Sequence, residues 1–406
     1  MHEKTVFEDF FSRTRLPHLY VGSTSSAWEI SGRVVRVRPM SRWLMVGGAV
    51  LSGGGALLFA CGSSNGVDNG HWDGTAVDAG MTDASIDLAD AYPTTDPDPD
   101  GGTRAAPSFG DAGASTTTIT SCTGKTAGSG DSVITLTSGN LLRDAILHVP
   151  SSYDKTKPTE LVLNFHGFTS NAAEQVILTR MNRAADARNL IVAYPDGVGA
   201  SWNAGDCCGD SWTNSVDDVA FTKALLAKLE GDYCVDSKRV YATGFSNGGF
   251  FSHKLGCEMS DVFGAIAPVS GVFGEDPNKC TPHRPMPVLD FHGTGDPIVP
   301  YNGGTPVIPI DLGSAFIQFR SVTSTIDAWR KIDGCLGSGT VVYKNGDATC
   351  TEYDSCRGGT NVTHCKIDDG GHAWPGGLSV PILGKTSNDI SATDTILNFF
   401  DAHPLP

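Results

Sequence analysis

The chain has 406 residues, enough for one large domain or two small ones, and its apolar and aromatic contents are ordinary for a globular protein. Its formal net charge at pH 7 is -16. Because phosphate binding requires clustered Lys and Arg, this charge balance argues against a nucleic-acid partner.

The amino-terminal residues are typical of an export signal. An apolar run over residues 43–60 follows Arg42 and ends at Ala60-Cys61-Gly62. This ending resembles the lipobox of bacterial lipoproteins, in which Cys61 would be lipidated and become the mature amino terminus. A plain secretory signal or a single anchor helix is the alternative. We predict a leader over residues 1–61, with Met40 as an alternative start, and export as an outer-membrane or cell-surface lipoprotein or to the medium.

Residues 62–121 form an acidic, low-complexity stretch. They contain ten Asp and only one basic residue, Arg104, with almost no apolar periodicity. Like charges repel and few apolar side chains can be buried, so we predict a disordered linker. The linker would tether a folded domain, residues 122–406, to a membrane that the chain contacts only through its lipid anchor.

From Cys122 onward, short apolar runs alternate with longer helical patterns. Helices are predicted at 171–188, 217–231, 247–258 and 316–332, and two antiparallel strands are expected near 120–150. Runs bounded by Gly and Pro predict buried strands at Leu161–Phe165, Leu190–Tyr194, Arg239–Thr243, Ala265–Val269 and Val288–Phe291. This alternation predicts one α/β domain, with a mostly parallel sheet flanked by helices.

Ten cysteines remain in this domain if Cys61 is lipidated. An even number in an exported chain predicts disulfides, whereas the spacings do not match a zinc site. We expect Cys257 to pair with Cys280, and Cys234 with Cys207 or Cys208. The other expected pairs join Cys122 to the remaining vicinal cysteine and link Cys335, Cys350, Cys356 and Cys365 among themselves.

The strongest chemical motif is Gly244-Phe245-Ser246-Asn247-Gly248, which matches G-x-S-x-G. It lies directly after a predicted strand and before a predicted helix, where the tight turn requires a small residue two positions from Ser246 on either side. This turn presents the Ser246 hydroxyl above the sheet edge, near the positive end of the helix. We predict that Ser246 is a nucleophile rather than part of a plain glycine-rich turn.

A serine hydroxyl needs a base, and folds with this motif place the residues in the order Ser, acid, His. Asp296 lies in a loop just past the strand Val288–Phe291, whereas Asp290 lies within that strand. His372 lies in a glycine-rich loop after a further expected strand near Val362–Ile367. We predict a triad of Ser246, Asp296 and His372.

The other histidines are expected to have structural roles. His253 would lie on the helix that follows Ser246, and His364 would lie inside a strand. His166 ends the strand Leu161–Phe165 and is expected to shape the next loop through hydrogen bonds.

An oxyanion formed at Ser246 needs two N–H donors. Asn247 follows the nucleophile and should supply one of them. The loop after the strand Leu161–Phe165 should supply the other, from Phe168 or Thr169.

Three tryptophans are candidates for substrate binding. Trp202 and Trp212 have the shape to stack on a sugar or an aromatic ring, and Trp374 lies two residues from His372. Packing against a disulfide-held loop is an equally good explanation for Trp202 and Trp212.

In combination, these segments resemble the polyhydroxybutyrate depolymerase-like and feruloyl esterase branch of the carbohydrate esterases. The resemblance covers nearly all of residues 145–402 and is carried by HGF, YPDG, WNAGDCCG, DDVAF, RVYATGFSNGG, FHGTGDPIVPY and GGHAWPGG. It implies an α/β-hydrolase fold, the triad named above, and no metal or organic cofactor.

We therefore predict an exported serine carboxylic-ester hydrolase that works through an acyl-enzyme. A feruloyl or acetylxylan esterase acting on plant cell-wall polysaccharide is favoured, because no appended polymer-binding domain is visible. A polyhydroxybutyrate depolymerase is the alternative. A serine peptidase is disfavoured by the lack of propeller repeats, and an inactive binding module by the intact triad. We expect a monomer.

Overall fold

The computed structural model describes residues 106–109, 121–307 and 318–406. The predicted leader, Cys61 and most of the predicted linker therefore lie outside the described residues. Within the described part of the chain, no helix is both long and apolar enough to cross a membrane.

Residues 106–109 of the predicted linker are described, and two of them contact the folded domain. The Asn398 side chain donates a hydrogen bond of 2.9 Å to the Pro107 carbonyl. Phe109 packs edge to face on Phe399, with ring centroids 5.1 Å apart. Both partners lie on helix α8 (Ala392–Asp401), so the prediction of disorder is wrong for residues 106–109.

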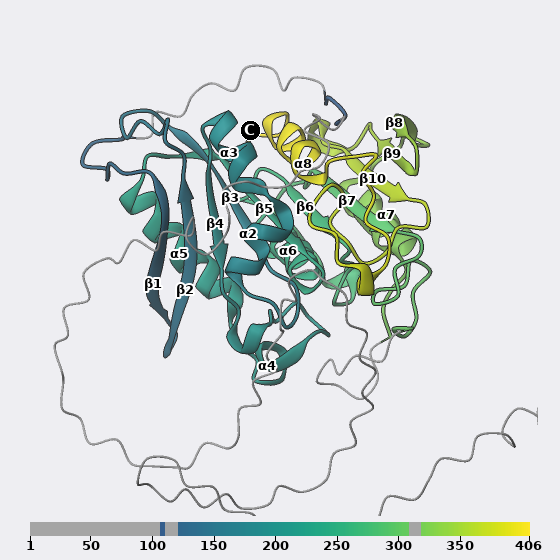
Figure 1. Ribbon diagram of the computed structural model, residues 1–406. Coiled ribbons are helices and arrows are strands. Elements are labelled where there is room, and N and C mark those ends of the chain that lie inside the picture. The colour runs from purple at the N-terminus through teal and green to yellow at the C-terminus, as the bar shows by residue number, and fades with distance from the viewer. Residues whose placement is uncertain (1–105, 110–120, 308–317) are drawn as a thin grey trace, which may run out of the picture. The chain divides into compact units, whose positions relative to one another are not determined.

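The described strands form one sheet in the order β1-β2-β4-β3-β5-β6-β7-β10-β9-β8 (Figure 1). Its six central members, β4 to β10 in that order, run parallel, whereas β1 and β2 at one edge and β9 and β8 at the other are antiparallel. The bounds are β1 Gly130–Ser138, β2 Leu141–Val149, β3 Thr159–Phe165, β4 Ile191–Pro195, β5 Val235–Phe245, β6 Ile266–Val269, β7 Val288–Gly293, β8 Thr340–Asn345, β9 Ala348–Tyr353 and β10 Val362–Ile367.

Helices cover both faces of this sheet, and each face has its own apolar cluster. One cluster joins the sheet to α5 (Asp218–Asp232), α6 (Asn247–Glu258) and α7 (Val322–Asp333). The other joins it to α2 (Ala172–Thr179), α3 (Met181–Arg188) and α8. Alternate residues of β3 serve the two clusters, Leu161 on one side and Val162 on the other, which explains its unbroken apolar run.

The five predicted parallel strands and the expected strand near 362–367 are confirmed, as is the antiparallel pair before them. The predicted helix 171–188 is instead two helices. Arg180 adopts the left-handed conformation between them, with φ 53°, and no Gly or Pro marks that break. The predicted helix 316–332 begins only at Val322, because Ser321 caps it by accepting a hydrogen bond from the Ser324 N–H.

Five disulfides link the ten described cysteines, which is typical of exported proteins. The Cys257–Cys280 pair is confirmed. The last four cysteines pair among themselves as expected, as Cys335–Cys356 and Cys350–Cys365. The other predictions are wrong: Cys207 bonds to its neighbour Cys208, and Cys122 bonds to Cys234. The start of β5, after Cys234, lies beside the domain's first residues, which the order of residues along the chain did not reveal.

Candidate active site

Ser246 forms the turn between β5 and α6. Its backbone lies at φ 54° and ψ -120°, a conformation that costs energy for a residue with a side chain. A Cβ on Gly244 would lie 2.6 Å from the Gly248 main chain, and one on Gly248 would lie 2.1 Å from the Phe165 carbonyl oxygen. Only glycine fits at these two positions, so their spacing in the sequence reflects a tight strand-to-helix turn at Ser246, here called the elbow. The Ser246 N–H donates to the Val269 carbonyl at 2.9 Å, which joins the elbow to β6.

Asp296 and His372 meet at the carboxyl-terminal edge of the sheet. Asp296 follows β7 and His372 follows β10, and these parallel strands are neighbours, so their loops emerge side by side. His372 Nδ1 lies 2.7 Å from Asp296 Oδ2. The His372 ring centroid lies 4.8 Å from that of Phe245, the residue before Ser246. The structure thus places the predicted base beside the elbow.

The Asp296 carboxylate is buried but well supplied with hydrogen bonds. Its Oδ1 accepts the main-chain N–H groups of Ile298 and Val299, each at 2.8 Å. Burial alone would raise the pKa of Asp296, but interactions with His372 and His292 outweigh it and hold the pKa well below its usual value. Asp296 is therefore ionised, and His372 Nδ1 donates its proton toward it.

The loop after β3 lies directly against the nucleophile. A Cβ on Gly167 would lie 3.3 Å from the Ser246 Cβ. The Thr169 N–H already donates to the Ala200 carbonyl at 2.8 Å, so the prediction of Thr169 as an oxyanion donor is wrong. The Phe168 N–H has no such partner within the described residues. Asn247 opens α6, so its N–H lacks an acceptor inside the helix.

Two of the three candidate tryptophans are fully buried, where they pack the core rather than present a ring to a substrate. Trp202 is fully buried, and its indole N–H donates to the His166 carbonyl at 2.9 Å. Trp374 is also fully buried, with its N–H on Thr393 Oγ1 at 3.0 Å. The only hydrogen-bond donor of each indole is thus used inside the core, and burial of such a large ring contributes strongly to stability. Trp212, on the short helix α4 (Gly209–Thr213), is half-buried, and its role in binding stays a prediction.

His166 has the loop-shaping role that the sequence indicated. Its Nε2 accepts the Gly197 N–H at 2.9 Å, and its Nδ1 lies 2.7 Å from the Gly167 carbonyl. Burial lowers the pKa of His166 to about 4, so the ring is neutral and Nδ1 is the donor. His253 and His364 are likewise structural, both directed at the buried carboxylate of Asp290, at 3.9 Å and 2.7 Å.

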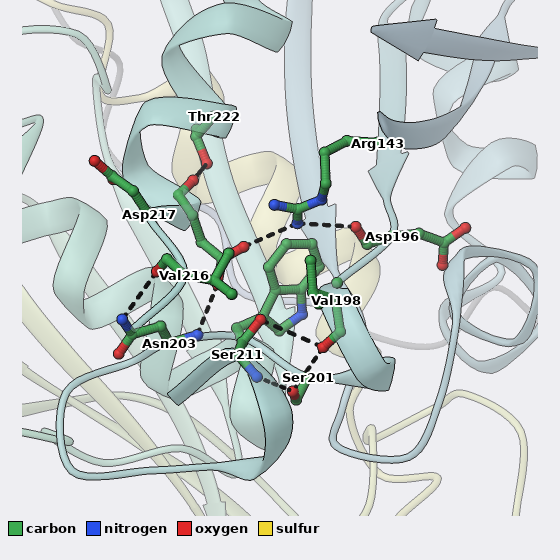
Figure 2. Close-up of polar contacts among 12 residues, drawn as sticks. Arg143, Asp196, Val198, Ser201, Asn203, Ser211, Val216, Asp217 and Thr222 are labelled. Atoms are coloured by element: carbon green, nitrogen blue, oxygen red, sulfur yellow. Dashed lines mark hydrogen bonds and ion pairs between the residues drawn. The ribbon is translucent and has the colours of Figure 1, made fainter. Parts of the chain in front are cut away.

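A buried ion pair holds the loops that follow β4. Arg143 of β2 donates to the Asp196 carbonyl at 3.0 Å and pairs with Asp218 at 2.8 Å (Figure 2). The second Asp218 oxygen accepts the Asn203 N–H at 2.8 Å. The Arg143 guanidinium also lies 3.9 Å from the centre of the Phe221 ring. Asp218 lies in the helix predicted at 217–231, and the sequence pattern indicated no role for Arg143.

The side chain of Asn247 makes a second contact that sequence reasoning missed. Its Oδ1 accepts the Trp202 N–H at 2.6 Å, and its Nδ2 donates to the Trp202 carbonyl at 3.1 Å. The sequence pattern also did not predict that His292, in the same motif as Asp296, contacts its carboxylate, with Nε2 3.3 Å from Oδ2. No group of three or more metal-ligating side chains occurs among the described residues.

Comparison with known proteins supports the same family. A family model described as esterase PHB depolymerase matches residues 145–301. Feruloyl esterase B of Piromyces equi is 35% identical over 238 residues, which span 57% of this chain but only 42% of that protein. A putative esterase, NocK, of Nocardia uniformis subsp. tsuyamanensis is 31% identical over 264 residues, or 60% of this chain and 74% of that protein. The solved acetyl xylan esterase from Aspergillus awamori aligns with a TM-score of 0.43 at 14% identity, over 59% of this chain and 94% of that one.

The sheet order and the serine elbow define an α/β-hydrolase. Within that class, the chain belongs to the polyhydroxybutyrate depolymerase-like and feruloyl esterase branch of the carbohydrate esterases, a family of carboxylic ester hydrolases.

Proposed function

We propose that the protein hydrolyses carboxylic esters through an acyl-enzyme on Ser246. The observation that carries this proposal is the 2.7 Å contact between Asp296 and His372 beside the elbow. Ser246 Oγ attacks the ester carbonyl carbon while His372 Nε2 takes its proton. The C–O bond of the tetrahedral intermediate then breaks, and His372 returns the proton to the leaving alcohol.

The second half of the reaction repeats these roles with water. His372 removes a proton from a water molecule that attacks the acyl carbon, and then protonates Ser246 Oγ as the free acid leaves. Asp296 orients the imidazole and stabilises its cationic form. The main-chain N–H groups of Phe168 and Asn247 stabilise the oxyanion in both halves.

We favour an aromatic acyl group, as in a feruloyl ester on plant cell-wall polysaccharide. A cavity of about 210 Å³ opens beside α6, and Phe250 in its wall lies one helical turn from Ser246. The wall comprises Asp206, Cys207, Phe250, Phe273, Gly274, Gln318, Phe319 and Arg320. Aromatic rings with a polar rim suit a ring that bears hydroxyl and methoxy groups, whereas an acetyl group would leave most of this volume unused. Similarity to the Piromyces equi feruloyl esterase supports the same choice.

We further propose that the protein is exported and held at the cell surface through lipid on Cys61. Its five disulfides support an oxidising compartment. Its substrate would then be an external polymer that the cell cannot import intact.

The proposal is tested by comparing methyl ferulate, acetylated xylan and polyhydroxybutyrate as substrates of the purified protein. Release of ferulate at the highest kcat/KM is expected. Preferred release of hydroxybutyrate would instead favour the polyester alternative that the family model's description suggests. Hydrolysis of none of the three, with no labelling of Ser246 by an organophosphate, would contradict the proposed chemistry.

A further inference from the structure

We propose that residues 197–202, here called the bridging segment, set the spacing between the two oxyanion donors, with the Asn247 carboxamide as their anchor. This inference rests on the proposed function, because it assigns the segment a role in stabilising the oxyanion. Asn247 would then act twice, through its main-chain N–H on the oxyanion and through its side chain as a positioning group.

One side of the bridging segment is bonded to the loop that contains Phe168. Three hydrogen bonds of 2.8–2.9 Å join the two: Gly197 N–H to His166 Nε2, the Trp202 indole N–H to the His166 carbonyl, and Thr169 N–H to the Ala200 carbonyl. They hold the residues two before and one after Phe168. The direction of the Phe168 N–H therefore follows the position of the bridging segment.

The other side is bonded to the nucleophile helix. Both polar atoms of the Asn247 carboxamide bond to the main chain of Trp202, at 2.6 Å and 3.1 Å. Both residues are buried, so water does not compete for these groups. The two donors lie far apart in the sequence, one in the loop after β3 and the other at the start of α6, and the bridging segment connects them in space.

The carboxyl-terminal end of the bridging segment is also held by contacts that do not involve Asn247. The next residue, Asn203, donates its N–H to Asp218, which pairs with Arg143 (Figure 2). The Trp202 ring also stacks on Phe251, with centroids 5.4 Å apart and planes 11° from parallel. Removing the Asn247 carboxamide should therefore break the link between α6 and the bridging segment without unfolding the loop.

The hydrogen bonds between Asn247 and Trp202 matter because oxyanion stabilisation depends on the placement of both donors before the reaction begins. A displacement of about 1 Å at a catalytic group can cost on the order of 10²-fold in rate. The transition state, in which negative charge develops on the carbonyl oxygen, loses more from misplaced donors than the bound ester does. Loss of these two hydrogen bonds should therefore lower kcat and leave KM nearly unchanged.

The test is the substitution Asn247→Leu, which keeps the side-chain size and the main-chain N–H but removes both bonds to Trp202. We expect kcat for an aryl acetate to fall on the order of 10²-fold, with KM within about threefold of the parent. Inhibition by a trifluoromethyl ketone, whose Ser246 adduct carries an oxyanion, should weaken by a similar factor. Asn247→Ala removes the same bonds without new bulk, and serves if the leucine variant does not fold.

Ser252→Ala is the matched control. Ser252 is buried on the same helix, and its hydroxyl donates to the Gly248 carbonyl at 2.9 Å rather than to the bridging segment. It should retain parental kcat and inhibitor affinity. Parental kcat and affinity in a folded Asn247 variant, or an equal loss in Ser252→Ala, would overturn the inference. Failure of the parent protein to react with an organophosphate at Ser246 would instead contradict the proposed function itself.

Discussion

His292 Nε2 lies 3.3 Å from Asp296 Oδ2, the same oxygen that His372 approaches to 2.7 Å. His292 Nε2 also lies 2.9 Å from the Val299 carbonyl, so this nitrogen carries a proton and donates to both acceptors. Together with two main-chain N–H groups, Asp296 thus receives four donors. Such a carboxylate resists both protonation and rotation, which suits a residue that must hold an imidazole.

The first prediction concerns the triad. Ser246→Ala and His372→Ala should each lower kcat on the order of 10⁴-fold or more, and Asp296→Asn should cost less, because the Ser–His pair survives it. Hydrolysis of an aryl acetate measures these losses. An organophosphate should label Ser246 alone. Parental activity in Ser246→Ala would refute the assignment.

The pH dependence of this activity should have a single acidic limb. Since the pKa of Asp296 is held well below its usual value, this carboxylate stays ionised throughout the working range, so its protonation should not contribute to the loss of activity as the pH falls. A plot of log kcat/KM against pH should therefore have a limiting slope of about one on the acid side. A slope of two would mean that a second group titrates with the base.

Acyl selectivity should depend on the cavity beside α6. Phe319→Ala removes one aromatic wall, and we expect kcat/KM for methyl ferulate to fall about tenfold or more. The rate on an aryl acetate, whose acyl group is small, should change by less than about twofold. Phe109→Ala is the control, since that ring packs on α8 instead. Equal losses on both esters would show that the cavity does not hold the acyl group.

Stability should fall between mildly acidic and neutral pH because of Asp333. This residue is fully buried, and desolvation, only partly offset by the Met286 N–H and nearby arginines, raises its pKa to about 7. Between its unfolded and folded pKa values the native state binds more protons than the unfolded state, so stability decreases as the pH rises through this window. Asp333→Asn cannot ionise. Its melting temperature relative to the parent should therefore increase from about pH 5 to about pH 8, by several degrees. A pH-independent difference would contradict this.

The disulfides can be tested by mapping peptides without reduction. Cys207 and Cys208 should occur as one oxidised pair within a single peptide, with no link to Cys122 or Cys234. Removing Cys122 and Cys234 together should lower the free energy of unfolding by about 2–5 kcal/mol. Any cross-link from the vicinal pair to another cysteine would disagree with the structure.

Anchoring is tested by Cys61→Ser in the full-length chain. If Cys61 carries lipid, this change should move the protein from the membrane fraction to the soluble fraction. Ser246→Ala should leave the fractionation unchanged and so controls for the effect of substitution itself. A Cys61→Ser protein that stays with the membrane would rule out the lipid anchor.

The central strands and the elbow could be predicted from sequence because local signals specify them. Buried parallel strands give unbroken apolar runs, and the crowding around Ser246 admits only Gly244 and Gly248. The break at Arg180 could not be predicted, since a residue with a side chain supplies the left-handed turn there.

Features that depend on contacts distant in the sequence were missed or misassigned. Trp202 was a candidate for substrate binding, with loop packing as an equally good explanation, and its hydrogen bonds to His166 and Asn247 depend on loops that only the fold brings together. Thr169 failed as a donor for the same reason, because its acceptor, the Ala200 carbonyl, lies in another loop. Cysteine pairing likewise depended on which strand starts lie side by side.

The Cys122–Cys234 bond also determines where a mechanical load on the chain would reach the central strand β5. Cys234 directly precedes β5, and Ser246 follows the opposite end of that strand, about 40 Å away at the usual rise per residue. A pull on the chain before Pro107 would load the contacts of Pro107 and Phe109 with α8 first, and then this cross-link at the amino end of the strand. The hydrogen bonds of β5 to its neighbours β3 and β6 would then spread the strain before it reached the nucleophile.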